Sequence, residues 1–419
     1  MMLLIYNTAI ATFDVTIRLA SLFHNKAQQL VEGRKNSWGK LEKFASNNYD
    51  KVIWFHAASL GEFEQGRPVM EELRKNDPSA KILLTFYSPS GYEVRKNYEG
   101  ADLVVYLPSD TKRNAMRFVE LAKPKAAIFI KYEFWYHYLK ACHDNNVVTL
   151  SVSSLFRADQ PFFKSYGTLH RQMLGCFDHI FVQDSASFDL LRKLGLTEVS
   201  VSGDTRFDRV TDIALQKKDI PEVLAFKSNE RLMVLGSVWP SDMEVVLPFL
   251  YKYKDKLKFI IAPHNIGDKD VQQVMNQLEG GAIRFSEISS KNLEDFRYLV
   301  IDNMGMLSSL YGYGEFAYIG GAFRKTLHNT LEAATHGVPV FFGDDETNKK
   351  FREAGKLTEV GGGFPIKNSR ELTEIFETLF SDEDKRKQAG DIASNFVKSN
   401  TGATNKIANY LHSHINMQS

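Results

Sequence analysis

An acidic residue stands directly after an apolar run near the start of the chain. The run VIWF, residues 52–55, has the β-branched and aromatic character of a buried strand. Small residues, among them Ser59 and Gly61, lead from this run to Glu62. Because small side chains leave the carboxylate uncovered, Glu62 is a candidate for proton transfer to or from a bulky acceptor. The alternative is an acid placed at a helix start, where the macrodipole favours negative charge.

A second group of candidates follows an apolar run in the other half of the chain. The segment VLGSVWPSDMEVV leaves the run through Ser237 and Trp239 and then offers Ser241 or Asp242 as an N-cap. Backbone amides at such a helix start can hold a phosphate. Ordinary capping explains the same residues equally well.

The segment IIAPHNIGDKDVQ places His264 immediately after Pro263 and just past another apolar run. A single histidine is usually structural. This one is expected at the strand end where ligands bind in open α/β sheets, so we count it as a candidate binding residue.

The richest stretch is YIGGAFRKTLHNTLEAATHGVPVFFG. Its glycines, Gly320 and Gly321, leave space beside the backbone, and His328, Asn329 and Glu332 follow. The spacing predicts that His328 and Glu332 share one helix face, where a carboxylate can accept hydrogen bonds from a ribose diol. The alternative is a capped surface helix with its alanines packed inward.

Two D-x-D patterns are the only hint of a metal site. They are Asp268–Asp270 and Asp382–Asp384, and both stand where helices are expected to begin. Acids are favoured at such positions by the macrodipole, so we expect neither a metal nor a cofactor at these sites. Neither G-x-x-x-x-G-K-[ST] nor a strand-linked G-x-G-x-x-G occurs, which argues against ATPases and dinucleotide enzymes.

The elements that must position these residues alternate along the chain. Twelve short apolar runs have the continuous β-branched character of strands covered on both faces, and amphipathic stretches such as residues 63–75 separate them. The expected strands are residues 51–57, 81–87, 102–108, 125–131, 147–153, 179–184, 199–203, 232–238, 257–263, 298–302, 316–321 and 338–343. Such alternation predicts parallel sheets with helical crossovers, and this many strands favours two doubly wound domains.

We therefore predict an α/β protein with two Rossmann-like domains that face a central cleft. The expected segments are an apolar helix at 1–22, a first domain at 23–205, a hinge at 206–230 and a second domain at 231–419. The hinge is placed on a polar stretch that contains Pro221.

Composition narrows the class of protein. The chain has 419 residues, of which 43% are hydrophobic and 25% charged, as expected of a well-packed globular protein. The net charge of +1 gives no support for a nucleic-acid surface. Cys142 and Cys176 are the only cysteines, so a disulfide framework is not expected and a reducing compartment fits.

The N-terminus departs from this profile. MMLLIYNTAIATFDVTIRLASLF is strongly apolar and is interrupted by Asp14 and Arg18. Its uncharged part, residues 1–13, is shorter than the roughly 20 residues that span a bilayer. Basic residues follow at Lys26, Arg34, Lys35, Lys40 and Lys43. We expect a helix that rests on an anionic membrane leaflet, with packing on its own domain as the alternative.

Taken together, the motifs resemble those of a known enzyme family. The stretch GGAF…HNTLEAATHGVPVFFG is similar to the nucleotide-sugar motif of GT-B glycosyltransferases. With six further motifs it resembles the bacterial 3-deoxy-D-manno-octulosonic acid (Kdo) transferases. These motifs are, in chain order, HAASLGE, TFYSPSGYE, VYLPSD, YEFW, GDTRFD and DNMGMLSSLY.

The resemblance implies roles for individual residues. Glu62 of HAASLGE matches the family's general base, and Glu133 of YEFW and Arg206 of GDTRFD match positions that support the transition state. The implied CMP-binding residues are Pro263, His264, Met304, Gly305, Met306, Asn329, Thr330, Leu331 and Glu332. With Ser237, Trp239, Gly321 and His328, they form the predicted donor site.

The chain departs from the family pattern at three places. Arg206 stands where lysine is usual, which keeps the charge but changes its geometry. Thr326 and Leu327 replace the Gly-Gly that many members carry before the His-Asn pair. Lys131 stands where many members have an acid, and this could alter how the acceptor is handled.

The resemblance implies an activity and a location. The enzyme transfers Kdo with inversion from CMP-Kdo to a hydroxyl of the lipid A precursor, in lipopolysaccharide synthesis at the cytoplasmic face of the inner membrane. CMP leaves through one phosphate, which positive side chains and a helix N-terminus can stabilise, so we expect a metal-independent reaction. The alternatives are another GT-B enzyme that uses a UDP-sugar, either a transferase or an epimerase, and a non-catalytic envelope scaffold.

Overall fold

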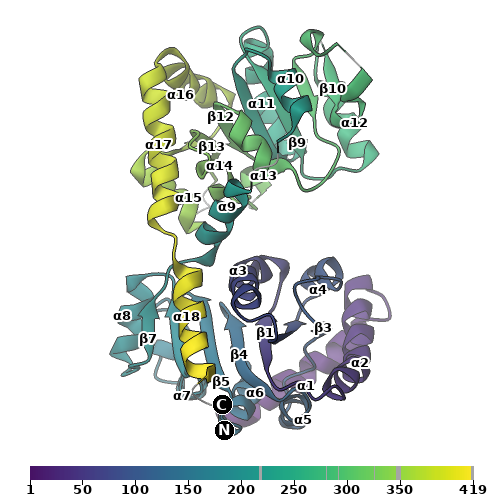
Figure 1. Ribbon diagram of the computed structural model, residues 1–419, viewed down its shortest axis with the longest axis vertical. Coiled ribbons are helices and arrows are strands. Elements are labelled where there is room, and N and C mark those ends of the chain that lie inside the picture. The colour runs from purple at the N-terminus through teal and green to yellow at the C-terminus, as the bar shows by residue number, and fades with distance from the viewer. Residues whose placement is uncertain (217–218, 280, 291, 325, 346–350, 417–419) are drawn as a thin grey trace. The chain divides into compact units, whose positions relative to one another are not determined.

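The computed structural model of the chain describes residues 1–419 except 217–218, 280, 291, 325, 346–350 and 417–419 (Figure 1). The chain forms two compact units. Unit 1 comprises Met1–Arg209 and Thr401–Ser419, and unit 2 comprises Val210–Asn400.

Unit 1 is built on a parallel sheet of seven strands in the order β3-β2-β1-β4-β5-β6-β7. The strands are β1 Val52–Ala57, β2 Lys81–Phe86, β3 Leu103–Tyr106, β4 Pro124–Ile130, β5 Val148–Ser154, β6 His179–Val182 and β7 Val199–Val201. All six residues of β1 are buried, because helices cover both faces. The strand order reverses between β1 and β4, and residues that follow these two strands meet there, outside their carboxyl ends.

The helices of unit 1 follow the predicted alternation. They are α1 Met2–Ala20, α2 Asn25–Ala45, α3 Leu60–Asn76, α4 Pro89–Arg95, α5 Lys112–Ala122, α6 Tyr136–Asp144, α7 Thr168–Leu174, α8 Ser185–Lys193, α9 Thr205–Leu215 and α18 Ala403–Asn416, with a short 3₁₀ turn at Pro161–Phe163. Helix α9 crosses the boundary between the units. Helix α3 begins after Ser59, whose backbone is still extended, so that Glu62 lies in its first turn.

Unit 2 has its own seven-stranded parallel sheet, in the order β10-β11-β9-β8-β12-β13-β14. The strands are β8 Leu232–Val238, β9 Lys258–Pro263, β10 Ala282–Arg284, β11 Tyr298–Val300, β12 Phe316–Ile319, β13 Val340–Gly343 and β14 Gly363–Ile366. The reversal here falls between β8 and β12. The two-domain α/β fold is therefore as predicted, whereas the edge strands β10 and β14 were not predicted.

The helices of unit 2 range from single turns to five turns. They are α10 Pro221–Lys227, α11 Pro240–Tyr253, α12 Asp268–Gln277, α13 Leu307–Leu310, α14 Leu331–Ala334, α15 Arg352–Val360, α16 Ser369–Ser381 and α17 Glu383–Ser399. Short 3₁₀ turns lie at Phe285–Ser290, Leu293–Asp295, Tyr311–Tyr313 and Ala322–Arg324.

The end of the chain returns to unit 1, unlike the predicted second domain of residues 231–419. In Figure 1 helix α18, in yellow, lies with the elements of unit 1. Its Ile407, Leu411 and Ile415 are buried in the core formed with β1 and β4. The carboxylate of Asp208 accepts hydrogen bonds from the backbone N–H groups of Gly402 (2.5 Å) and Thr404 (2.8 Å), and so fixes the start of this helix.

The predicted hinge at 206–230 also differs from the structure. Most of its described residues belong to α9 and α10, and the boundary between the units falls at Arg209. The polar composition that suggested a linker belongs instead to the solvent-facing sides of two helices.

Candidate functional site

Glu62 lies half-buried in the first turn of α3, just beyond the carboxyl end of β1. Its carboxylate accepts a hydrogen bond of 2.5 Å from the backbone N–H of Ala58. Burial and the nearby charge of Glu133 nevertheless raise the pKa of Glu62 to about 7, because the N–H groups of Ala58 and Ser59 and the charge of Lys131 offset them only in part. The carboxyl is therefore harder to ionise than its position at a helix start predicts.

Glu133 follows β4 and is only 7% exposed. Its Oε2 lies 2.9 Å from Nε2 of His56 and accepts a hydrogen bond of 2.7 Å from Nε1 of Trp135. Nδ1 of His56 lies 2.9 Å from the hydroxyl of Thr85. That hydroxyl accepts a hydrogen bond of 2.8 Å from Nε1 of Trp54 and donates one of 3.3 Å to the carbonyl oxygen of Phe55.

The approach to Glu62 is open on the side of the small residues. Gly61 is exposed, and a Cβ added there would meet no atom within 4 Å. Ser59 is half-buried and directly precedes α3. That these small side chains leave room for an acceptor beside the carboxylate remains a prediction.

Arg206 is held near the helix that carries Glu62. Its guanidinium pairs with the buried Asp204 at 2.7 Å, and Asp204 also accepts hydrogen bonds from Gln65, one turn beyond Glu62 on α3. Burial alone would raise the pKa of Asp204, but the Arg206 guanidinium outweighs it and holds that pKa below its usual range. Thr205 adds a hydrogen bond of 2.5 Å to the carbonyl oxygen of Gln65.

In unit 2, three predicted donor-site residues form one aromatic cluster. The ring of Trp239 stacks on His264 at 3.9 Å between centroids, and His264 lies 4.8 Å from the ring of His328. Nε1 of Trp239 donates to Nε2 of His328 at 3.4 Å. Arg324 lies over the Trp239 ring at 4.9 Å. The cluster joins the ends of β8 and β9 to the loop after β12.

The two histidines of this cluster favour the neutral form. Burial lowers the pKa of His264, and burial together with the neighbouring His264 lowers the pKa of His328 to about 4. At neutral pH they therefore provide rings and hydrogen bonds rather than positive charge in the free protein.

A buried carboxylate fixes the loop that carries the cluster. Asp242 accepts hydrogen bonds from the backbone N–H groups of Trp239 (2.8 Å) and Gly321 (2.9 Å) and from the Tyr318 hydroxyl (2.9 Å). Gly321 has a φ of +95°, and a Cβ there would lie 2.9 Å from the His328 ring. Asp242 is thus the third residue of α11 and not its N-cap, and Ser241 is not the N-cap either, because the helix begins at Pro240, directly after its N-cap Trp239.

The prediction that His328 and Glu332 share one helix face is wrong. Helix α14 begins only at Leu331, so His328 and Asn329 lie in the preceding loop. Asn329 accepts a hydrogen bond from the N–H of Leu331 at 3.2 Å and donates one to Glu332 at 3.4 Å. Thr330 and Leu331 are completely buried, so a role for them in binding remains a prediction.

The remaining predicted donor residues lie on separate loops. Pro263 ends β9 beside His264, and Ser237, in β8, has a left-handed φ of +54°. Met304 is 84% exposed, Gly305 has a φ of +89°, and Met306 precedes α13. A role for this Met304–Met306 loop in binding remains a prediction.

The D-x-D residues serve as helix-start acids. Asp268 and Asp270 lie in the first turn of α12, and Asp382 caps α17 by accepting from the N–H of Lys385 at 3.1 Å. Among the residues that the structure describes, no group of three or more His, Cys, Asp or Glu side chains is arranged to hold a metal ion.

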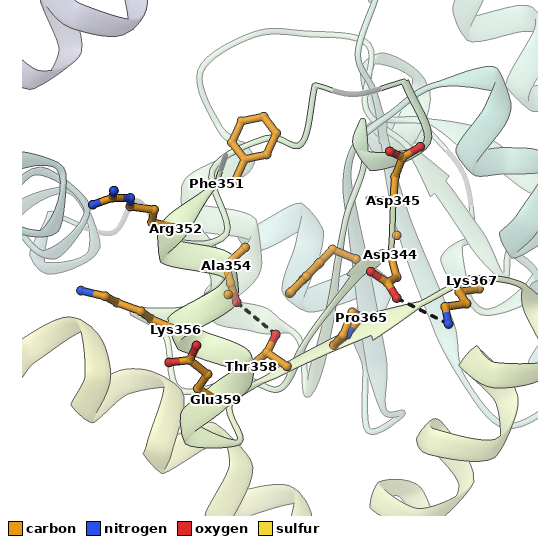
Figure 2. A pocket seen from close by; sticks show the side chains of 13 residues that line it. Asp344, Asp345, Phe351, Arg352, Ala354, Lys356, Thr358, Glu359, Pro365 and Lys367 are labelled. Carbon is orange, nitrogen blue, oxygen red and sulfur yellow. Dashed lines mark hydrogen bonds and ion pairs between the residues drawn. The ribbon is translucent and has the colours of Figure 1, made fainter. Parts of the chain in front are cut away.

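Unit 2 also has a pocket of about 780 Å³ (Figure 2). It is bordered by α15 and the ends of β13 and β14, and Lys367 pairs there with Asp344 at 3.9 Å. None of the predicted donor residues lines it. Its basic and acidic side chains are mixed, so its charge does not point to one ligand.

Two sets of contacts around the candidate residues were not predicted from the sequence. Glu133 is hydrogen-bonded to His56 of β1 and to Trp135 of its own motif, and His56 is in turn hydrogen-bonded to Thr85 of β2. A polar residue within the apolar run of β1 is the signal that could have singled out His56. The hydrogen bond that Asp242 accepts from the N–H of Gly321 joins residues 79 positions apart, so local spacing does not reveal it.

The fold places the chain in a known structural class. Its structure matches UDP-GlcNAc 2-epimerase from Neisseria meningitidis with a TM-score of 0.60 and 14% identity, over 87% of this chain and all of the other. MurG from Acinetobacter baumannii matches with a TM-score of 0.55 and 12% identity, over 87% and 99% of the two chains. The protein thus has the two-domain GT-B fold.

Sequence comparisons relate the chain to one enzyme family within this class. A family model for 3-deoxy-D-manno-octulosonic-acid transferase matches residues 32–209. The Kdo transferase of Aquifex aeolicus is 29% identical over 80% of this chain and 88% of its own. That of Chlamydia muridarum is 26% identical over 87% and 86%, and that of Haemophilus influenzae 24% over 86% of each. Residues 32–209 thus match the Kdo transferase family model, and most of the chain is similar to bacterial Kdo transferases, which are glycosyltransferases.

Proposed function

We propose that this protein transfers Kdo from CMP-Kdo to a hydroxyl of a lipid A precursor, with inversion and with Glu62 as general base. The observation that carries the proposal is the site of Glu62. Its carboxyl has an open approach at Gly61 and a pKa raised to about 7. A base whose pKa lies near the working pH combines a useful ionised fraction with high proton affinity.

In the proposed reaction, ionised Glu62 takes the proton from the acceptor hydroxyl. The acceptor oxygen bonds to the anomeric carbon of Kdo as the bond from that carbon to the CMP phosphate oxygen breaks, and CMP leaves with the electron pair. One base on the attacking side and direct displacement give inversion. Glu133, fixed by His56 and Trp135, maintains the negative charge that raises the proton affinity of Glu62.

The donor-binding role falls to unit 2. The Trp239–His264–His328 cluster offers flat rings and neutral imidazole donors, and Gly320 and Gly321 let the loop that carries His328 pack closely against the backbone of Ser237 and Thr326. Arg206 in unit 1 supplies positive charge for the departing phosphate. Because CMP carries a single phosphate, we propose that these groups suffice without a metal ion.

The amphiphilic character of the proposed acceptor supports a location of the protein at the cytoplasmic face of the inner membrane. Helix α1 is long and apolar enough to cross a bilayer by length and composition. Because lipid A precursors are amphiphiles, an enzyme that acts on them must work at a membrane surface.

Product analysis tests this function. The protein is incubated with CMP-Kdo and a detergent-solubilised lipid A precursor, and mass spectrometry should find the lipid heavier by Kdo, with CMP released in equal amount. CMP should raise the Tm more than UDP does at the same concentration. Turnover of a UDP-sugar, or a Tm response to UDP alone, would favour the other GT-B activities, and no response to any nucleotide would favour a scaffold.

A further inference from the structure

Helix α1 is attached to unit 1 through its polar side chains. The Tyr6 hydroxyl donates to Asp110 at 2.5 Å, and Asn7 lies 2.7 Å from Nε2 of His137. These contacts require the helix to lie along the unit. A bilayer-spanning helix would face lipid on all sides and would leave the buried Asp110 without this donor.

The opposite face of α1 and the residues after it are apolar and exposed. The side chains of Leu4, Ile5, Val15, Leu19, Leu22 and Phe23 are exposed by 70%, 55%, 58%, 61%, 72% and 92%. No residue of the helix is fully buried. A helix with polar contacts inward and apolar side chains outward has the arrangement of an in-plane membrane anchor.

A pocket of about 360 Å³ lies between α1 and α2, and Arg18, which lines it, directly precedes the exposed Leu19 of this apolar face. Its cationic lining residues are Arg18, Arg34 and Lys35, and its only acidic one is Asp14. Asp14 is already engaged, because it accepts from Arg34 at 3.4 Å and from the Ser109 hydroxyl at 2.5 Å. The pocket therefore keeps a net positive charge.

Two further features suit the pocket to a phosphate group. Among the described residues, neither Arg18 nor Lys35 has an ion-pair partner, and both are exposed. Asn114, in the first turn of α5, also lines the pocket, so the positive end of an eleven-residue helix borders it. None of Glu62, Glu133 and Arg206 lines it, which separates it from the candidate catalytic residues.

We propose that this pocket binds the phosphate headgroup of an anionic membrane phospholipid, with the acyl chains along the exposed face of α1. Arg18 and Lys35 are the contacts that such a headgroup would gain. The proposal deepens the proposed function, because it specifies how an enzyme for a lipid acceptor is held in the plane of the bilayer. A bilayer lipid is the occupant favoured here, since the apolar face and the cationic pocket are adjacent on the same helix.

Binding to vesicles tests the site without measuring activity. Full-length protein is sedimented with phosphatidylcholine vesicles with and without phosphatidylglycerol. Arg18→Ala/Lys35→Ala should weaken binding to the anionic vesicles by about 30-fold, since each basic side chain at such a surface is worth about fivefold. Lys26→Ala/Lys43→Ala removes the same charge from α2 outside the pocket and should cost clearly less. Equal losses in both double variants would mean diffuse attraction and would overturn the proposal.

The apolar face gives a second, separable readout. Leu19→Ser/Leu22→Ser should weaken binding to both kinds of vesicle, whereas the pocket variant should affect only the anionic ones. A short-chain, soluble phosphatidylglycerol should raise the Tm of the wild type and not that of Arg18→Ala/Lys35→Ala. An equal rise with inorganic phosphate, or a rise only with the phosphorylated acceptor, would contradict a phospholipid site.

Failure of this proposal is distinguishable from failure of the proposed function. Retained CMP binding shows that the variants are folded. Arg18→Ala/Lys35→Ala should keep normal turnover of detergent-solubilised acceptor, because the pocket lies apart from Glu62. A lost turnover with intact vesicle binding would assign these residues to the acceptor instead.

Discussion

Burial shifts the pKa of Glu62 in unit 1 and that of His328 in unit 2 in opposite directions, but it disfavours the charged form of both side chains. Burial raises the pKa of Glu62 to about 7 and lowers that of His328 to about 4. In each case the low-dielectric surroundings disfavour the charged form. Glu62 is thereby poised to exchange a proton near neutral pH, whereas His328 stays neutral and serves as a ring and hydrogen-bonding group. Under the proposed function, the chemical step belongs to unit 1 and nucleotide binding to unit 2.

Replacing the base should give the largest effect. Glu62→Gln is nearly isosteric and its amide oxygen can still accept from Ala58, so fold and CMP affinity should persist. Turnover should fall by roughly 10²–10⁴, as is typical of a lost general base. Rates and CMP dissociation constants are to be measured on one sample. Near-normal turnover would transfer the role of base to Glu133.

The substitution in unit 2 that corresponds to Glu62→Gln in unit 1 is Trp239→Ala. It removes the ring that stacks on His264 and donates to His328. An aromatic pair of this kind is worth about 0.5–1.5 kcal/mol, so CMP affinity should fall by about two- to tenfold. Turnover at saturating CMP-Kdo should change little. A loss of turnover comparable to that of Glu62→Gln would break the division between the two units.

A smaller effect concerns stability. Because the folded state holds the Glu62 proton more tightly than the unfolded chain does, this group destabilises the fold increasingly as pH rises from about 4.5 through about 7. Glu62→Gln should therefore raise the Tm at pH 8, by about 2–4 °C if roughly 1 kcal/mol is recovered. Near pH 4.5 the two proteins should melt alike. A variant less stable than the wild type at pH 8 would contradict the burial argument.

The smallest effect is expected from metal removal. Asp268 and Asp270 lie in the first turn of α12, and Asp268 already pairs with Arg284 at 3.0 Å. EDTA should leave turnover essentially unchanged, as measured by CMP release. If EDTA inactivated the enzyme and magnesium reversed this, the D-x-D residues would become candidate metal ligands and the metal-independent mechanism would be contradicted.

The alternation of apolar runs sufficed to predict the class of fold. Long internal strands such as β1 and β8 are continuously apolar because helices cover both faces, and this signal is local. The edge strands β10 and β14 have only three and four residues, and β14 contains glycine and proline. Their pairing depends on neighbouring strands, so periodicity did not reveal them.

The errors at the site share one cause, which is contact between distant segments. Helix α18 returns to unit 1 through the carboxylate of Asp208, about 195 residues earlier in the chain. Contacts near Gly321 hold the loop before α14, and this helix begins only after His328. Residue types at strand ends were predictable, because the sheet topology alone brings them together. Their pKa values were not, because burial and neighbouring charge set them.

The pH dependence of the chemical step tests the central claim most directly. Single-turnover rates with bound CMP-Kdo are measured for the wild type and for Glu62→Gln. The wild-type rate should rise with pH through an apparent pKa near 7, as Glu62 ionises, and this limb should be absent from the residual activity of Glu62→Gln. The same limb in both proteins, or a wild-type limb near the ordinary carboxyl value of 4.5, would contradict Glu62 as the base.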